Sequence, residues 1–305
     1  MSTAAQQTAL WRDEYPFYSH RMRVRGASLH YVDEPGVGDD ARTLLFVHGN
    51  PTWSFHWRRL ITELRGEFRC VAPDHLGCGL SDKPSQEFTL QDRIDDLVAL
   101  IDELDLQRVT LVAQDWGGAI GLGAMLERID RLEGVLLFNT GAFPPWFIPR
   151  RIAVCRTPLL GRVALQGMNL FSLAALRMTL SRTKQLAPAV KAGYLAPYGT
   201  WNDRRAVHQF VADIPRSPKH PTWRTLERIE GRLGELGHLP IRLVWGMKDW
   251  CFTPECLDRF ERHWPSASVH RLQDVGHWVV EDTPEDALRL TQEHLQSTTP
   301  VAPTA

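Results

Sequence analysis

The sequence lacks any apolar run that approaches the ~18 consecutive residues a membrane-spanning helix needs. It also lacks an excess of charge, since 35 Lys and Arg stand against 36 Asp and Glu and the formal net charge is -1. This balance gives the chain no overall attraction for nucleic acid. Residues 1–17 have neither a basic start nor an apolar centre, so we expect no signal peptide.

Cysteine is scarce and irregularly spaced. The chain has five of them, at Cys70, Cys78, Cys155, Cys251 and Cys256. An odd and scattered set argues against a disulfide framework and against a zinc site. We therefore expect a cytoplasmic protein that needs neither a metal ion nor a cofactor.

What the sequence has throughout is an alternation of short apolar runs with longer amphipathic segments. The 305 residues, of which 43% are hydrophobic, suffice for a large buried core. The alternation is typical of an α/β fold with a mostly parallel central sheet flanked by helices. Strands are expected at 29–32, 44–47, 69–72, 109–113, 134–138, 241–245 and 268–272, and helices at 90–104, 119–128, 254–264 and 284–295.

This alternation stops between about residues 139 and 221, where the chain is helical in character and rich in Pro, Leu, Met and Arg. We predict that residues 1–139 and 221–296 form the core and that 140–220 form a helical cap, inserted after the sixth strand. Residues 297–305 are predicted to be a disordered tail. A cap at that place would cover the carboxyl ends of the strands, where ligands bind in open α/β sheets.

The strand VTLVA runs directly into Gln114, Asp115, Trp116 and two glycines, and a helix is expected to follow. This order is typical of a nucleophile elbow, a sharp turn that presents one side chain at the end of the sheet. Serine usually holds that position, but a carboxylate is ionised at neutral pH without a helping base. Asp115 is suited to attack a saturated carbon and form an ester. The alternative is that Asp115 only caps the helix.

Two further side chains complete a catalytic set in the order nucleophile, acid, histidine that this fold uses. Asp249 follows the expected strand 241–245, and His277 follows the expected strand 268–272. His277 would serve as a base, and Asp249 would orient it and stabilise its charge. Because each of the three residues follows an expected strand, a catalytic role is favoured over three unrelated surface positions.

Asn50 and Trp116 are candidate hydrogen-bond donors for a leaving group, through a side-chain amide and an indole N–H. The alternative for Trp116 is plain core packing. We interpret His48 as a structural residue that holds the loop around Asn50. The glycine-rich turn at 74–81 is interpreted as architectural, because no phosphate-binding helix pattern follows it.

Four motifs give the chain a clear resemblance to the haloalkane dehalogenases, and the resemblance covers nearly the whole sequence. They are HGNPTWSF at 48–55, QDWGG at 114–118, GMKD at 246–249 and GHWVVED at 276–282. The resemblance implies an α/β-hydrolase fold in which Asp115 is the nucleophile, His277 the base and Trp116 a halide donor.

The same resemblance bears on the acid and on the second donor. In that family the catalytic acid follows one of two strands, and the earlier of the two positions is Asn139, which cannot act as an acid. The role therefore passes to Asp249. The second donor implied by the resemblance is Asn50.

Further segments resemble the β-lactone decarboxylases of bacterial long-chain olefin biosynthesis: FNTGAFPPWFIPRRI at 138–152, GYLAPYGTW at 193–201, FVADIP at 210–215 and KDWCF at 248–252. Members of that family convert cis-3,4-dialkyl-β-lactones into cis-olefins and carbon dioxide. The resemblance implies a small hydrophobic substrate with long alkyl chains. It also implies a complex with the β-lactone synthetase and other enzymes of the pathway. Asp115 could attack either the saturated ring carbon or the carbonyl.

Three other functions compete with this one. A haloalkane dehalogenase would use the same five residues. An epoxide hydrolase needs two cap tyrosines well separated in sequence, whereas this cap offers only Tyr194 and Tyr198. A non-catalytic binding protein would be expected to have lost part of the catalytic set, yet every member is present.

The expected cap contains no acidic residue between 134 and 202. We expect its apolar side chains, Met168 and Phe171 among them, to line a channel for two alkyl chains. Arg150, Arg151 and Arg156 would form an outer basic face that docks an acidic partner. The alternative is an ordinary amphipathic cap with a solvated basic face.

Overall fold

An eight-stranded sheet forms the centre of the protein in the computed structural model, which describes residues 10–38, 41–157 and 159–297. The strand order is β1-β2-β4-β3-β5-β6-β7-β8, with β2 antiparallel to both of its neighbours, β1 and β4, and all other neighbouring strands parallel. The predicted α/β fold is thereby confirmed. The strands are β1 (His20–Val24), β2 (Ala27–Glu34), β3 (Thr43–Val47), β4 (Arg69–Pro73), β5 (Val109–Asp115), β6 (Leu132–Thr140), β7 (Ile241–Gly246) and β8 (Ser268–Leu272).

The sequence pattern failed to predict β1. Its residues HRMRV alternate between half-buried and exposed, because it pairs with β2 at one edge of the sheet. Arg25 and Gly26, with φ angles of 49° and 77°, form the two-residue turn between the two strands. A polar edge strand has no continuous apolar run, and the turn has no strong sequence signal, so neither was recognised.

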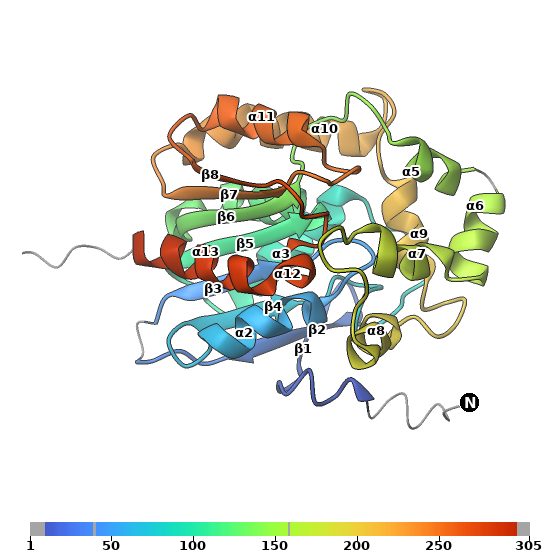
Figure 1. Cartoon of the computed structure of the whole chain (residues 1–305), viewed down its shortest axis with the longest axis horizontal. Helices are drawn as coiled ribbons and strands as arrows, with labels where there is room; N and C mark the ends of the chain where they lie inside the picture. The colour runs from blue at the N-terminus through green and yellow to red at the C-terminus, as the bar shows by residue number, and fades with distance from the viewer. Residues whose placement is uncertain (1–9, 39–40, 158, 298–305) are drawn as a thin grey trace, which may run out of the picture.

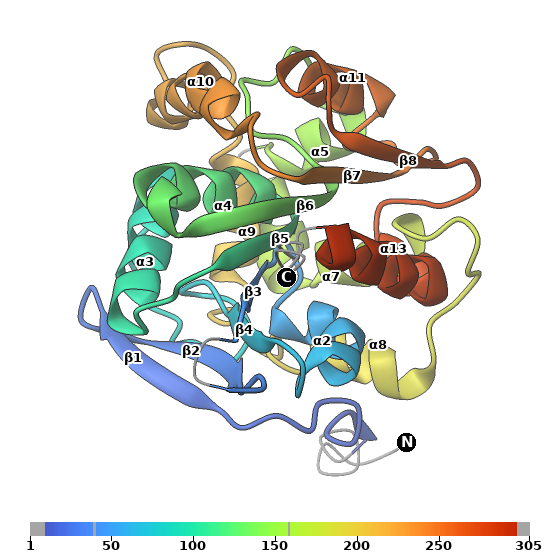
Figure 2. The ribbon, with the colours of Figure 1, turned by 90° about the vertical axis from the view of Figure 1, so that its left-hand side faces the viewer.

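Helices cover both faces of the sheet, as Figures 1 and 2 show. In β3, Leu45 and Val47 belong to one hydrophobic cluster while Leu44 and Phe46 belong to the other, which explains the continuous apolar sequence of this strand. The first cluster includes residues of α3 (Leu90–Glu103), α4 (Trp116–Glu127), α10 (Pro221–Arg232) and α11 (Pro254–His263). The second includes residues of α2 (Arg58–Leu64), α12 (Val279–Asp282) and α13 (Pro284–Ser297).

The predicted helical insertion after the sixth strand is confirmed, and Figure 1 shows it beyond one end of the sheet. We call residues 140–220 the cap segment. Its helices are α5 (Arg150–Cys155), α6 (Leu160–Arg162), η3 (Val163–Gly167), α7 (Leu170–Met178), α8 (Pro188–Leu195) and α9 (Arg205–Ala212). That this segment is a separate domain stays a prediction. Ser297 ends α13, and the other residues of the predicted tail, 298–305, lie outside the described residues.

Candidate active site

Asp115 lies at the sharp turn between β5 and α4. Its φ of 55° and ψ of -133° are unusual for a residue with a side chain, so the turn is strained. The backbones pack closely here, because a Cβ atom added to Gly117 would lie 2.0 Å from the carbonyl oxygen of Val47. The turn thus has the geometry of a nucleophile elbow, and Asp115 is one of the residues that line a cavity above the sheet.

Both carboxylate oxygens of Asp115 have a neighbour. The backbone N–H of Asn50 donates to Oδ1 over 2.7 Å, and Nε2 of His277 lies 3.5 Å from Oδ2. Gly49 must lack a side chain, since its Cβ would lie 2.1 Å from Oδ1. The loop after β3 therefore approaches the carboxylate closely, and it holds Asp115 in one orientation.

His277 and Asp249 also lie together. Nδ1 of His277 is 2.7 Å from Oδ2 of Asp249, whose other oxygen accepts the backbone N–H of Cys251 over 2.7 Å. Asn139 does not take part in this arrangement. Its side-chain amide accepts the N–H of Gly246 over 2.7 Å and donates to the carbonyl of Gly246 over 3.0 Å, so it joins the ends of β6 and β7.

The two carboxylates change the titration of His277. Burial by itself lowers the pKa of the imidazole, but the charge of Asp249 and the hydrogen bonds to Asp115 and Asp249 outweigh it and raise the pKa to about 10. The ring is therefore an imidazolium at neutral pH. When the Asp115 carboxylate becomes an ester, it loses its charge, and one of the contributions that raise the pKa of His277 is removed.

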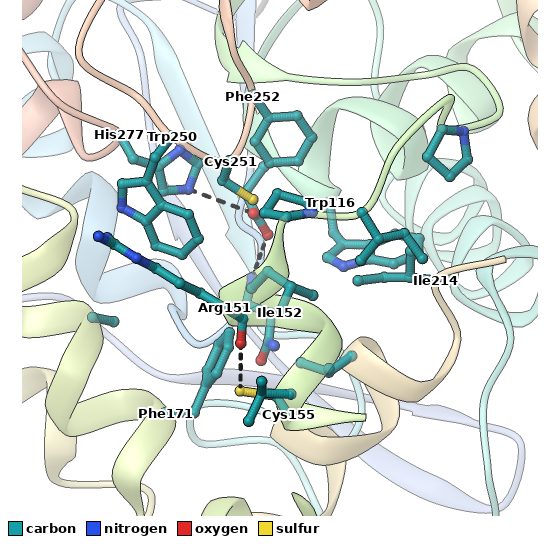
Figure 3. A pocket seen from close by; sticks show the side chains of 18 of the residues that line it. Trp116, Arg151, Ile152, Cys155, Phe171, Ile214, Trp250, Cys251, Phe252 and His277 are labelled. Atoms are coloured by element: carbon teal, nitrogen blue, oxygen red, sulfur yellow. Dashed lines mark hydrogen bonds and ion pairs between the residues drawn. The ribbon is translucent and has the colours of Figure 1, made fainter. Parts of the chain in front are cut away.

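Asn50 and Trp116 both line the cavity that contains Asp115. The side-chain N–H of Asn50 donates to the carbonyl oxygen of Val207 in α9 over 3.1 Å. The indole of Trp116 packs 5.7 Å from the ring of Phe210, and its N–H makes no hydrogen bond to any residue that the structure describes. Trp116 and His277 flank the cavity in Figure 3. Trp116 is thus only partly buried and lines the cavity, while it also packs against the core.

The cavity has a volume of about 660 Å³ and a mostly apolar lining. Apart from Asp115 and His277, the lining contains a single charged side chain among the described residues, that of Arg151, whose guanidinium lies 5.2 Å from the ring of Trp250. Figure 3 shows Arg151 and Trp250 beside each other at this cavity. The ligand this cavity suits best is therefore apolar with one polar or reactive group.

Part of the predicted cap arrangement was wrong. Phe171 lines the cavity as expected, but Met168 does not, and its side chain is 60% exposed. Arg151 lines the cavity, and the guanidinium of Arg156 donates to the carbonyl of Ile214. Arg150 and Arg151 are both exposed, so the outer basic face stays a prediction, although Arg151 also lines the cavity.

Gln114, which precedes the nucleophile, has a positioning role that the sequence analysis missed. Its side-chain N–H donates to the carbonyl oxygen of His277, and its side-chain oxygen lies within hydrogen-bonding distance of Nε2 of His56. Gln114 and His56 are both buried. Through Gln114, the turn that carries Asp115 is fastened to the loop that carries His277.

A buried polar chain continues from His56 into the cap segment. The hydroxyl of Tyr194 in α8 lies 2.7 Å from Nδ1 of His56 and donates to Glu281 over 2.7 Å. Glu281 pairs in turn with the buried guanidinium of Arg58. The motif GHWVVED contains Glu281 and was the one sequence signal for this chain of contacts. Tyr194 therefore has a structural role. No tyrosine lines the cavity in the described part of the chain.

The other conspicuous histidine, His48, is buried beneath the loop that carries Asn50. Its Nδ1 lies 2.7 Å from the carbonyl oxygen of Gly49, and its Nε2 accepts the backbone N–H of His75 over 3.1 Å. Burial lowers the pKa of His48 to about 4, so its ring is neutral. These contacts hold the loop after β3 against the glycine-rich turn.

Comparison with known proteins identifies the family. A family model described as the alpha/beta hydrolase fold matches residues 42–284. The chain belongs to the α/β-hydrolase family. Within it, the chain is 36% identical to a cis-3-alkyl-4-alkyloxetan-2-one decarboxylase of Shewanella oneidensis, over 90% of this chain and 86% of the relative. A protein of the same name from Xanthomonas campestris is also 36% identical, over 89% of this α/β hydrolase and 93% of the relative.

Haloalkane dehalogenases are also related to this α/β hydrolase. Haloalkane dehalogenase 2 of Mycobacterium tuberculosis is 33% identical over 89% of the chain and 92% of the relative. The crystal structure of the haloalkane dehalogenase DatA from Agrobacterium tumefaciens superimposes with a TM-score of 0.82 at 27% identity, covering 92% of this chain and 97% of that one. Both resemblances expected from the sequence motifs are thereby confirmed.

Proposed function

We propose that this α/β hydrolase is a β-lactone decarboxylase that converts cis-3,4-dialkyl-β-lactones into cis-olefins and carbon dioxide. The observation that carries the proposal is the position of the Asp115 carboxylate. It lies at an apolar cavity, next to His277, and accepts a hydrogen bond from the backbone N–H of Asn50. Two relatives that are 36% identical are named as decarboxylases of an oxetan-2-one with alkyl groups at carbons 3 and 4, which is such a lactone.

The proposed first step is attack on the saturated ring carbon that bears the ring oxygen. An oxygen of Asp115 forms a bond to this carbon, the bond from the carbon to the ring oxygen breaks, and the configuration inverts. The leaving group is a carboxylate that stays attached through carbon 3. Trp116 and Asn50 line the same cavity and are the proposed donors for its developing charge.

The second step releases both products. The bond between carbon 3 and the carboxylate breaks, its electrons form the carbon–carbon double bond, and the bond to Asp115 breaks. Carbon dioxide leaves, and the Asp115 carboxylate is restored without water. Inversion followed by anti elimination amounts to a net syn loss, so that a cis lactone gives a cis olefin.

The protonation of His277 distinguishes this reaction from that of a dehalogenase. The two steps of the lyase reaction require no proton transfer, so His277 can remain an imidazolium that holds Asp115 in place. A hydrolase needs His277 to activate water after the ester has formed, when the loss of the Asp115 charge lowers the imidazole pKa. Haloalkane dehalogenase is therefore the second candidate, supported by the relatives and solved structures of that name.

One comparison of substrates tests the proposal. Incubation with a cis-dialkyl-β-lactone should give olefin and carbon dioxide faster than any bromoalkane gives bromide. Gas chromatography would quantify the olefin, and an ion-selective electrode would quantify bromide. Bromide release far above olefin formation would make the protein a dehalogenase.

We further propose that the protein acts in the cytoplasm in a complex with the β-lactone synthetase and other olefin-pathway enzymes. Its five thiols are free, which suits a reducing compartment. A lactone with long alkyl chains is poorly soluble, so direct transfer from the enzyme that forms it would be an advantage. Within the described residues, no helix combines the length and the apolar character that a membrane span requires. Co-purification of the enzymes at low salt tests the complex.

A further inference from the structure

Exposed apolar side chains are concentrated on the cap segment. Of the fourteen large apolar side chains exposed among the described residues, eleven lie between 146 and 201. The side chains of Leu159, Leu160 and Val154 are 76%, 74% and 67% exposed. Val154 belongs to α5, Leu160 belongs to α6 and Leu159 directly precedes α6. The helices α5 and α6 contact each other and lie at one end of the molecule in Figure 1. Single exposed apolar residues are common, but such a group marks an interaction surface.

The same surface contains the mouth of the cavity. Six of these exposed side chains also line the cavity above Asp115, and a side chain that meets both solvent and cavity lies at the opening. They are Trp146, Phe147, Val154, Leu160, Leu170 and Met178. A substrate that enters the cavity therefore crosses an apolar rim.

Positive charge is frequent in the same stretch of chain. The stretch from 134 to 202 has eight Lys and Arg and no Asp or Glu. Arg150, Arg162 and Arg177 are exposed, and none of the three forms an ion pair with a described residue. Exposed apolar groups and exposed cations on the same helices match the interface of an anionic bilayer, with acyl chains inside and phosphates outside.

We propose that this surface docks the protein on an anionic lipid membrane, with the cavity mouth facing the acyl region. The arginines would bind lipid phosphates, and the protruding leucines would enter the hydrocarbon. A fluid bilayer accepts protruding side chains such as Leu159 without a complementary partner surface, whereas a protein interface requires close packing. The inference rests on the proposed function only for the identity of the lipid-like substrate that would enter from the membrane.

Flotation with vesicles tests the docking. The vesicles are phosphatidylcholine alone or phosphatidylcholine mixed with phosphatidylglycerol. We expect the wild-type chain to bind the anionic vesicles preferentially and to dissociate at high salt. The double variants Leu159→Asp/Met168→Asp and Arg162→Glu/Arg177→Glu should each lower the bound fraction by about tenfold or more. All four residues lie outside the cavity lining, so the cavity itself is unchanged.

Matched controls come from exposed positions elsewhere on the fold. Val37→Asp changes an apolar side chain that is 73% exposed, and Arg23→Glu/Arg262→Glu reverses two exposed arginines of β1 and α11. These controls should bind as the wild type does. Equal losses in the control and cap variants, or no vesicle binding by the wild type, would overturn the proposal. Binding to a purified partner enzyme without any vesicle binding would also overturn it.

The docking proposal and the proposed reaction can be tested independently of each other. Flotation needs no turnover, so vesicle binding that depends on Leu159 and Met168 supports the docking even in a protein that releases no olefin. Circular dichroism and thermal unfolding of each double variant ensure that a loss of binding reflects the surface and not the fold.

Discussion

Nε2 of His277 lies 3.5 Å from Oδ2 of Asp115, and this contact helps to raise the pKa of the imidazole to about 10. Asp115→Asn removes the charge of one carboxylate, so the pKa of His277 should fall well below that of the wild type. Nuclear magnetic resonance titration of the His277 ring protons would measure the change. An unchanged pKa would mean that Asp249 alone sets the protonation of His277.

The raised pKa of His277 also predicts how the free energy of unfolding depends on pH. The pKa of His277 is higher in the folded state than its ordinary value of 6.5, so the interaction stabilises the fold fully below about pH 6.5. That stabilisation is lost as the pH rises through about 10. The difference in free energy of unfolding between the wild type and Asp115→Asn should therefore shrink between these two values. Urea unfolding at several pH values would measure it, and a constant difference would contradict the interpretation.

Asp115→Ala should abolish turnover, because no other carboxylate of the described residues lines the cavity and could form the ester. In the wild type, rapidly quenched reactions should show the mass of the lactone on the peptide that contains Asp115. Asp105→Ala is a suitable control, since the Asp105 side chain is 77% exposed. Retained activity in a folded Asp115→Ala protein would remove Asp115 from the mechanism.

Loss of a leaving-group donor should slow the reaction without unfolding the protein. Trp116→Phe keeps the packing against Phe210 but removes the indole N–H, and it should cost on the order of 2–4 kcal/mol at the transition state. Asn50→Ala should slow turnover similarly, and it also removes the side-chain hydrogen bond to the carbonyl of Val207 in α9. Steady-state kinetics would measure both, with Trp223→Phe in α10 as the control. Unchanged rates would leave Trp116 and Asn50 as structural residues.

Tyr194→Phe should destabilise the fold by about 1–3 kcal/mol, because Glu281 and His56 would each lose a buried hydrogen-bond partner. Tyr18→Phe removes the same hydroxyl from a residue that is 82% exposed and should have almost no effect. Urea unfolding of the two variants would give the difference. Equal stability of the two would show that the buried chain of contacts contributes little.

The alkyl chains of the substrate should bind in the cavity. Because each buried methylene contributes ~0.8 kcal/mol, turnover at low substrate concentration should rise with chain length. Phe171→Asp should penalise long chains most, since Phe171 lines the cavity, while Met168→Asp should not. Lactones dispersed in detergent would keep membrane docking out of this assay. Rates that are independent of chain length would argue against the apolar cavity as the binding site.

The sequence by itself determined the order of the central strands along the chain and the candidate residues at their ends. Buried parallel strands must be apolar on both faces, so β5, β6 and β7 were readable as continuous runs. Asp115, Asp249 and His277 stand just at or beyond strand ends, where a parallel sheet gathers its functional groups. Local pattern and topology were therefore enough to bring them together.

Only the tertiary structure decided which cap residues meet the cavity and which meet solvent. Phe171 and Met168 are three positions apart and equally apolar, yet the first lines the cavity and the second is exposed. The helices of the cap segment are short, and their orientation is fixed by contacts with distant residues, as Tyr194 contacts His56 and Glu281. The spacing of apolar residues identifies the buried face of a long helix. Which side of a short helix is buried depends on tertiary packing, which the local sequence pattern does not contain.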